Sequence, residues 1–361
     1  MKRNVAKLGG KAPTIKDIAE KLNISSVSVH RALAGKEGVS EKLRAQILQT
    51  AKEMGYEVNY AAASLKRKVC QIAVVLPQDV GKYYAYIWDG IWHCEKEVRG
   101  LNIEVQEQIC CNEEHQYELL KTIADSDMYS GVITILYTRN PKILMQLQRL
   151  IAKNIMTVVI DEDLKEPEGL YCIPANDVAV GQVAGELMSL IAPNHGTVLV
   201  TSQRKNSEIR NNKIASFCRY MKEKKPELKI CVIDRGMDDV AVSDVIYHSV
   251  KEQLKKIDDI VACYFLTSSD NEPTVQAIKD SGKLKEIMII GTDFNELTSQ
   301  MLARGELRVV INQAAYKKGY MGLHVLVDKV IKNIDPPLRL DSPIDVILKS
   351  NASYYENLNK I

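Results

Sequence analysis

From residue 70 onward, short apolar runs alternate with amphipathic segments at intervals of roughly 30 residues. The runs typical of strands span 70–76, 101–105, 132–136, 155–160, 197–200, 229–233, 260–266, 287–290 and 308–311. The helix-like segments include 84–99, 117–124, 142–152, 182–191 and 316–331. This alternation predicts an α/β body of parallel, doubly wound sheets with helices on both faces. About 290 residues exceed one such core, so we expect two similar lobes.

A different pattern precedes this body, at residues 14–35, and it predicts a helix, a tight turn and a second short helix. Thr14 can cap the first helix, Asn23 marks the break, and Ser25 can cap the second helix. The first helix carries one apolar stripe, made of Ile15, Ile18, Ala19 and Leu22. The second helix has an apolar face of Val29, Ala32 and Leu33. Its other side chains point away from that face, and they are Ser26, Val27, Ser28, His30 and Arg31.

A third helix is expected between a Ser40 cap and Gly55. Its predicted apolar positions are Leu43, Ile47, Leu48, Ala51 and Met54. The three helices would make a small all-α head in which a packed pair presents a polar, Arg-bearing face, as a helix-turn-helix does to a DNA major groove. An ordinary helical hairpin inside an all-α domain is the alternative.

Charge is distributed unevenly along the chain. The formal net charge is only +2, yet residues 1–68 hold fourteen Lys or Arg against six Asp or Glu. A basic head on an acidic body is expected when only the head meets phosphate. After the head, a cap at Asn59, three alanines and Leu65 favour a short helix that would be marginal unless something holds it. A basic linker is the alternative for this segment.

The sequence also limits the cellular compartment of the protein and the kinds of reaction that it can catalyse. No apolar run suits a signal peptide or a membrane span, so we expect a cytoplasmic protein with no membrane partner. The eight cysteines form no CxxC pair and are expected to be reduced thiols, with an adjacent redox pair at Cys110 and Cys111 as a weaker alternative. We find no nucleophile elbow, phosphate-binding loop, HExxH or GxGxxG motif, so neither catalysis, metal nor cofactor is predicted.

The loops after the predicted strands gather aromatic, carboxylate, amide and Arg side chains. These loops are 78–84, 137–140, 161–163, 202–210, 268–272, 292–295 and 312–313. Because ligands of doubly wound folds bind beyond the carboxyl ends of the strands, we expect the loops to form a binding site. Flat rings and fork-shaped polar groups suit a polyhydroxylated ligand.

The head resembles that of the lactose-repressor (LacI) family of bacterial transcription regulators. The matching motifs are Thr-Ile-Lys-Asp-Ile-Ala from Thr14, Val-Ser-Val-His-Arg-Ala-Leu-Ala-Gly from Val27, Val39-Ser40-Glu41 and Met54-Gly55-Tyr56-x-x-Asn59. The body is similar to periplasmic sugar-binding proteins, through Val75-Leu76-Pro77, Tyr83-Tyr84, Gly90-Ile91, Asn176-Asp177, Gly181, Gly291-Thr292-Asp293 and Gln313. The resemblance implies a DNA-binding domain at 1–58, a hinge at 59–69 and an effector-binding body at 70–361. Within the body it implies an N-lobe of about 70–173 and 313–340, and a C-lobe of about 174–312 and 341–361.

The resemblance also implies roles for single residues in the head. The DNA-binding set is Thr14, Ser25, Ser26, Val27, Ser28, His30, Arg31, Asn59, Ala62 and Leu65. Arg31 would contact guanine, with a solvated or ion-paired surface residue as the alternative, and Leu65 would wedge into the minor groove. His30 departs from the family's small serine, and Val27 offers only apolar contact.

For the effector cleft the resemblance implies Asp79, Tyr83, Tyr84, Tyr137, Arg210, Asp270, Asp293 and Gln313. Gly81-Lys82 replaces the usual Asn-Pro, and no Gly-aromatic pair follows Arg210. Tyr137 and Trp88 are additional aromatics that suit packing as well as ligand contact, while Trp88 and Trp92 together suit a core or an interface.

The function that follows is a homodimeric regulator, most simply a repressor, that binds a near-palindromic operator. A small-molecule effector, expected to be a carbohydrate, would modulate its affinity by moving the lobes. The tail at 351–361 lacks leucine heptads for a tetramer. The alternatives are a cytoplasmic sugar-binding module whose head docks to a protein, and an enzyme built on the α/β body.

Overall fold

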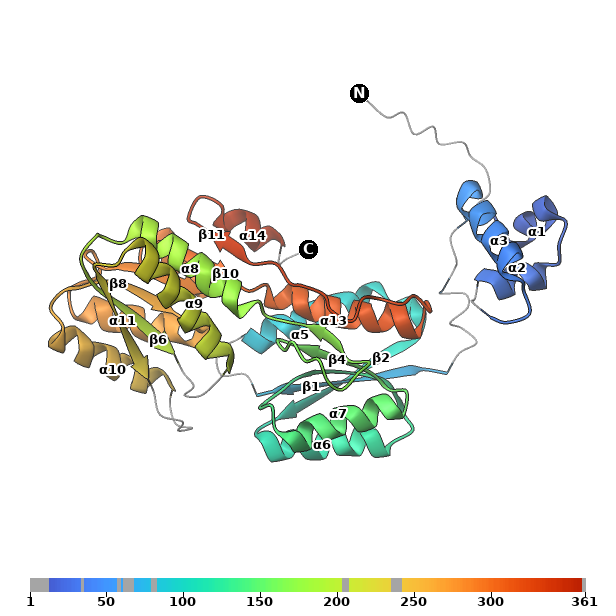
Figure 1. The fold of residues 1–361 in the computed structure, drawn as a ribbon, viewed down its shortest axis with the longest axis horizontal. Coiled ribbons are helices and arrows are strands. Elements are labelled where there is room, and N and C mark those ends of the chain that lie inside the picture. The colour runs from blue at the N-terminus through green and yellow to red at the C-terminus, as the bar shows by residue number, and fades with distance from the viewer. Residues whose placement is uncertain are drawn as a thin grey trace, which may run out of the picture.

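The computed structural model describes residues 13–33, 36–56, 60, 68–78, 83–202, 208–234 and 242–358. Its first unit is a bundle of α1 (Ile15–Leu22), α2 (Ser26–Leu33) and α3 (Glu41–Met54) (Figure 1). Ile18, Val29 and Ile47, one from each helix, are fully buried against one another. Three short helices therefore share one apolar core, as the spacing of their apolar residues predicts.

The expected helix caps are present in this bundle. The Asp17 amide donates to Thr14 Oγ1, and the Thr14 amide donates back to Asp17, which together form a capping box. Ser40 accepts from the Leu43 amide, and Gly55 ends α3 in a left-handed conformation with φ 67°. One core prediction is wrong: Leu48 is 47% exposed, whereas Thr50 is buried. The buried row of α3 passes through positions 47, 50, 51 and 54, and residue 48 lies beyond its edge.

The first lobe is built on a fully parallel sheet with the strand order β2-β1-β3-β4-β5. Its strands are β1 (Cys70–Pro77), β2 (Ile103–Cys110), β3 (Tyr129–Ile135), β4 (Met156–Ile160) and β5 (Tyr171–Ile173). On one face pack α5 (Tyr83–Glu97) and α13 (Ala315–Val330), and on the other pack α6 (Glu113–Asp125) and α7 (Pro141–Ala152) (Figure 1). A short 3-10 helix, η1 (Arg99–Leu101), precedes β2.

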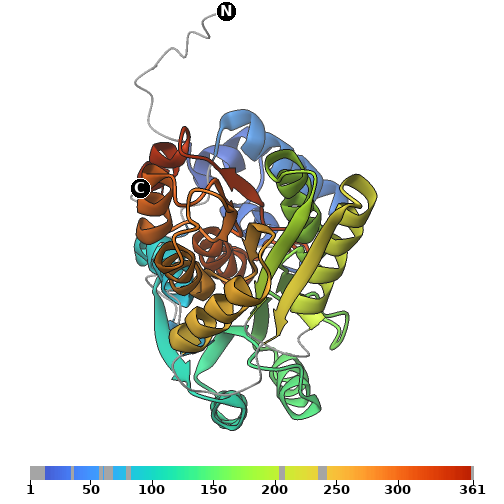
Figure 2. The same cartoon turned by 90° about the vertical axis from the view of Figure 1, so that its left-hand side faces the viewer.

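The second lobe has a sheet of order β11-β10-β9-β8-β6-β7, with helices on both faces (Figure 2). Its strands are β6 (Gly196–Ser202), β7 (Leu228–Asp234), β8 (Ile260–Phe265), β9 (Met288–Thr292), β10 (Val309–Asn312) and β11 (Asp345–Ile347). One face carries α8 (Asp177–Ile191) and α9 (Glu208–Lys224). The other carries α10 (Val242–Lys256), α11 (Asn271–Asp280) after η2 (Ser268–Asp270), α12 (Glu296–Arg304) and α14 (Ala352–Leu358).

The predicted two-lobed α/β fold is confirmed, with differences at the sheet edges. The second sheet is not wholly parallel, because β11 pairs antiparallel with β10 after the chain returns from the first lobe. The strand expected at 101–105 begins later and runs to Cys110, since this edge strand is buried only at its two ends and lacks a continuous apolar run. The chain passes between the sheets after β5, after β10 and before β11.

Glycines allow α5 and α13 to pack closely in the first lobe. A Cβ atom added at Gly90 would lie 1.9 Å from the Tyr316 carbonyl oxygen, and one added at Gly319 would lie 2.0 Å from the Ile87 carbonyl oxygen. Backbone atoms cannot yield as a side chain can. The two helices therefore need glycine at both positions to approach this closely.

Replacing Gly319 with alanine is expected to lower the free energy of unfolding by about 1–3 kcal/mol, because the new methyl group overpacks a helix crossing. Chemical denaturation followed by far-UV circular dichroism measures the change. Gly322→Ala, one turn further along α13, is the matched control, because its Cβ would first meet the Ile160 Cδ1 atom at 3.3 Å. Equal stabilities of the two variants would contradict this view of the crossing.

Candidate functional site

The second helix of the head separates a buried face from an exposed one. Val29 and Ala32 are buried. Among the residues proposed to meet DNA, those exposed on this helix and at its start are Ser25, Ser26, Val27, His30 and Arg31, while Ser28 is half-buried. The Ser28 amide donates to Ser25 Oγ over 3.1 Å, so the helix start is held by its own side chain. The hydroxyl of Thr14 is likewise engaged at the start of α1, where it donates to Asp17 Oδ2 over 2.8 Å.

Two arginines in the described part of the head differ in their surroundings. Arg44 is tied to the end of α2, because its guanidinium donates to the carbonyl oxygens of Ala32 over 3.0 Å and Lys36 over 2.6 Å. Arg31 is exposed and passes over Gly38, and within the described residues no ion pair holds its side chain. Arg44 is therefore structural, and Arg31 is available to a partner.

Some proposed site residues lie outside the described part of the chain. Asn59, Ala62, Leu65 and Asp79 belong to this group, as does the side chain of Arg210.

On the first-lobe side of the cleft, a lysine, a carboxylate and a phenol form one cluster. Lys318, on the first turns of α13, is fully buried and donates to Asp161 Oδ1 over 2.6 Å and to the Tyr83 hydroxyl over 3.1 Å. The Tyr83 hydroxyl also donates to Asp161 Oδ2 over 2.9 Å. Burial and then the Asp161 charge raise the pKa of Tyr83 well above its usual value, which keeps the phenol a hydrogen-bond donor.

A second cluster lies on the second-lobe side. Lys213 of α9 donates to Gln313 Oε1 over 2.6 Å and lies 3.3 Å from Asp177 Oδ1, while Gln313 Nε2 donates to Asp293 Oδ1 over 3.1 Å. Burial raises the pKa of Asp177 and Asp293, and Lys213 opposes the shift at both. Tyr264, fully buried on β8, also faces these two acids, whose charges add to the effect of burial in raising its pKa. Each lobe thus holds a buried ion-pair cluster, one in contact with Tyr83 and the other linked through Gln313 to Asp293.

Three of the proposed effector residues have other surroundings. Asp270 is fully buried and accepts from Thr201 Oγ1 over 2.9 Å, inside the second lobe. Tyr137 is half-buried against the core beneath α6 and α7. Tyr84 packs edge-on against Tyr83, with ring centroids 5.6 Å apart. Among the additional aromatics, Trp88 is buried and stacks on Trp92, which is 46% exposed.

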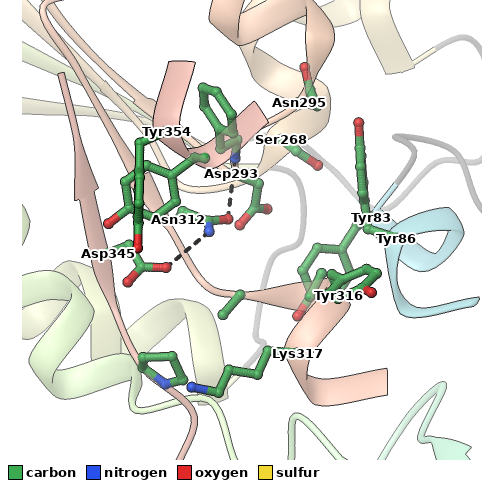
Figure 3. Close-up of a pocket in the computed structure, with 15 residues that line it drawn as sticks. Tyr83, Tyr86, Ser268, Asp293, Asn295, Asn312, Tyr316, Lys317, Asp345 and Tyr354 are labelled. Carbon is green, nitrogen blue, oxygen red and sulfur yellow. Dashed lines mark hydrogen bonds between the residues drawn. The ribbon is translucent and has the colours of Figure 1, made fainter. Parts of the chain in front are cut away.

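A cavity of about 490 Å³ lies between the lobes (Figure 3). It is lined by Tyr83, Tyr86, Ser268, Asp293, Phe294, Asn295, Asn312, Ala314, Ala315, Tyr316, Lys317, Pro343, Asp345, Tyr354 and Tyr355. The sequence therefore anticipated Tyr83 and Asp293 as residues lining the cleft. Gln313 lies behind Asp293, in contact with its carboxylate.

Several lining residues were missed by the residue-by-residue prediction. Ser268, Asn295 and Asn312 lie in polar loops marked from the sequence, so the strand ends were a usable signal. Asp345 and Tyr354 come from β11 and α14, where no apolar run predicted an element. Lys213 and Lys318 lie on helices, where a lysine is predicted from sequence to be exposed to solvent, because its burial becomes known only from the structure.

The described residues contain neither a membrane-spanning helix nor a group of metal ligands. Within them, no helix combines the length and apolar character that crossing a membrane requires. The same part of the chain contains no group of three or more His, Cys, Asp or Glu side chains placed to hold a metal ion.

Comparison with known proteins agrees with this architecture. Residues 14–59 match the bacterial regulatory proteins of the lacI family, and residues 72–333 match the periplasmic binding protein domain. The HTH-type transcriptional regulator RegA of Clostridium saccharobutylicum is 29% identical over 157 residues, which are 42% of this chain and 45% of RegA. The chain thus spans about half the length of the curated RegA relatives that it matches.

Solved structures show the same fold. A LacI-type transcriptional regulator from Bacteroides fragilis, described as putative, superposes with a TM-score of 0.70 at 18% identity, covering 80% of this chain and 100% of its own. A periplasmic solute binding protein of an ABC transporter from Actinobacillus succinogenes, solved with bound D-allose, gives 0.70 at 15% identity, covering 79% and 100%. The chain belongs to the proteins with a periplasmic binding protein domain, and it carries in front of that domain a helix-turn-helix head of the lacI family of bacterial regulatory proteins.

Proposed function

We propose that the protein is a homodimeric, cytoplasmic transcriptional regulator, a repressor in its simplest form, whose affinity for operator DNA is set by a small ligand. The observation that best supports this proposal is that one chain contains two separate sites. One is an exposed, Arg-bearing face on α2 of a lacI-type head. The other is a cavity lined from both lobes of the body.

At the DNA end, α2 would enter the major groove with Arg31 directed at a guanine and Val27 at an apolar base edge. Ser25, Ser28 and Thr14 would position the head against phosphates. Asn59, Ala62 and Leu65 would form the hinge that reaches the minor groove. Two heads related by a two-fold axis require a near-palindromic operator.

At the ligand end, a molecule that contacts both walls of the cavity would favour one separation of the lobes over another. The first-lobe wall belongs to α5 and α13, so a change in lobe closure moves the lobe that leads into the hinge. A coupling of about 1–3 kcal/mol would change operator affinity about 5- to 150-fold. We infer a carbohydrate-like ligand, because the cavity combines tyrosine rings with Asp, Asn and Ser side chains.

The test begins by selecting bound sequences from random double-stranded DNA with the full-length protein. A near-palindromic consensus is expected, and its affinity should fall steeply with salt because phosphate contacts release counterions. Sugars are then titrated against the complex. Failure to enrich any sequence would contradict the proposal and would favour a head that docks to a protein.

A further inference from the structure

The two walls of the inter-lobe cavity differ in chemistry (Figure 3). On the second-lobe wall, the carboxylates of Asp293 and Asp345 lie on either side of Asn312. On the first-lobe wall lie the rings of Tyr83, Tyr86 and Tyr316. A space with carboxylates on one side and aromatic faces on the other is suited to a cation, because both attract positive charge.

Neither carboxylate makes a direct ion pair within the described residues, although the charges of Lys213 and Lys318 lower the pKa of Asp293 against the effect of its burial. Asp293 Oδ1 accepts from the Gln313 amide over 3.3 Å and from Gln313 Nε2 over 3.1 Å, and Asp345 Oδ2 accepts from Asn312 Nδ2 over 3.3 Å. All of these donors are neutral amides. The carboxylate of Asp293 is nevertheless largely withdrawn from water, since the residue is only 8% exposed. A largely buried carboxylate whose hydrogen bonds all come from neutral groups can still gain from a cationic partner in direct contact.

The nearby buried lysines already have partners. Lys213 lies beside Asp177 and donates to Gln313, and Lys318 donates to Asp161. Lys317 also lines the cavity, but it is exposed at the rim. An anionic ligand would therefore face two carboxylates with one solvated lysine to hold it.

The negative charge of the cavity carboxylates also affects the pKa values of nearby tyrosines. Burial is the main cause that raises the pKa of Tyr83 and of Tyr355, and at each a cavity carboxylate adds to the shift, Asp293 at Tyr83 and Asp345 at Tyr355. The carboxylates of the second-lobe wall thus act on one tyrosine from each lobe, Tyr83 and Tyr355.

We propose that the cavity binds a hydroxylated ring that carries an ammonium group, in chemical class an amino sugar. The ammonium group would lie between Asp293 and Asp345, the ring against the tyrosines, and the hydroxyls at Ser268 and Asn295. This inference rests on the proposed function, because the ligand is taken to be the effector. It goes further in assigning to that effector a positive charge, which a neutral sugar lacks. Asp345 supplies specificity from a strand that the sequence did not predict.

The test is titration calorimetry of the full chain with glucosamine, galactosamine and mannosamine, each beside its parent hexose and its N-acetyl derivative. At least one amine is expected to bind about tenfold or more tightly than both of its neutral partners, the gain of one charge-assisted hydrogen bond. Asp345→Asn and Asp293→Asn should each remove most of that preference. Asparagine tolerates the left-handed conformation of Asp293, φ 60°, so the fold is expected to persist.

Asp258→Asn is the matched control, an exposed aspartate before β8 at the opposite end of the sheet, and it should leave the preference intact. Equal binding of amines and parent hexoses, or binding of none of the amines, would overturn the inference. Operator binding is measured separately. If a neutral sugar shifts operator affinity, the proposed function is supported, but the inference that the effector carries an ammonium group is wrong.

Discussion

Arg31→Ala is expected to weaken binding of the selected operator by about 2–6 kcal/mol in a dimer, because each of two bidentate contacts to guanine contributes about 1–3 kcal/mol of discrimination. The side chain is exposed and makes no ion pair within the described residues, so the head should remain folded. Fluorescence anisotropy with the selected operator measures the loss. Circular dichroism checks the helices.

Arg31→Lys separates the charge of this side chain from its shape. Lysine keeps the positive charge but loses the planar fork, so the variant should retain non-specific, salt-dependent binding while discriminating poorly at the guanine. Arg44→Ala tests a different property, since Arg44 caps α2 and its loss should reduce helix stability first. Unchanged operator affinity in Arg31→Ala would refute the placement of α2 in the major groove.

The head could be predicted from sequence because local rules determine it. Thr14, Ser40 and Gly55 act on helix ends only a few residues away, and the apolar period places Ile18, Val29 and Ile47 in the core. The same holds for most strands of the body, which are buried on both faces and therefore continuous apolar runs. The strand β11 carries no such run, and its antiparallel pairing with β10 depends on where the chain returns.

The candidate site was predicted less completely, because it is assembled by long-range packing. Tyr83 and Asp293 follow strands and fall where the fold places ligands. Asp161 and Lys318 are 157 positions apart in the sequence, and only the packing of α13 on the first sheet brings them together. No local pattern distinguishes Lys318 from a surface lysine, and the same applies to Asp345 on its short edge strand.

The Lys318–Asp161 pair gives the largest stability effect that we expect. Lys318→Met should lower the free energy of unfolding by about 3–5 kcal/mol, because it leaves a largely buried carboxylate without its cation. The Asp161 side chain is 14% exposed, so water reaches it in part and the lower end of that range is favoured. Denaturant unfolding of the full chain measures the change.

A second substitution identifies the cause. Asp161→Asn removes the uncompensated charge, and asparagine accepts the left-handed backbone of residue 161, φ 67°. The double variant should therefore recover most of the stability lost by Lys318→Met, whereas two independent lesions would add. Lys121→Met is the control, because its pair with Glu118 on the surface of the same lobe should contribute less than about 1 kcal/mol.

The double variant also separates stability from ligand binding. Tyr83 lines the cavity and is held by both members of the pair. If the pair only stabilises the lobe, a well-folded double variant should bind its ligand as the native protein does. If the pair positions Tyr83, ligand affinity should fall although stability has recovered. We expect the second result, because a buried ion pair can often be replaced without loss of stability, and its retention beside the cavity is then explained by the ring that it holds.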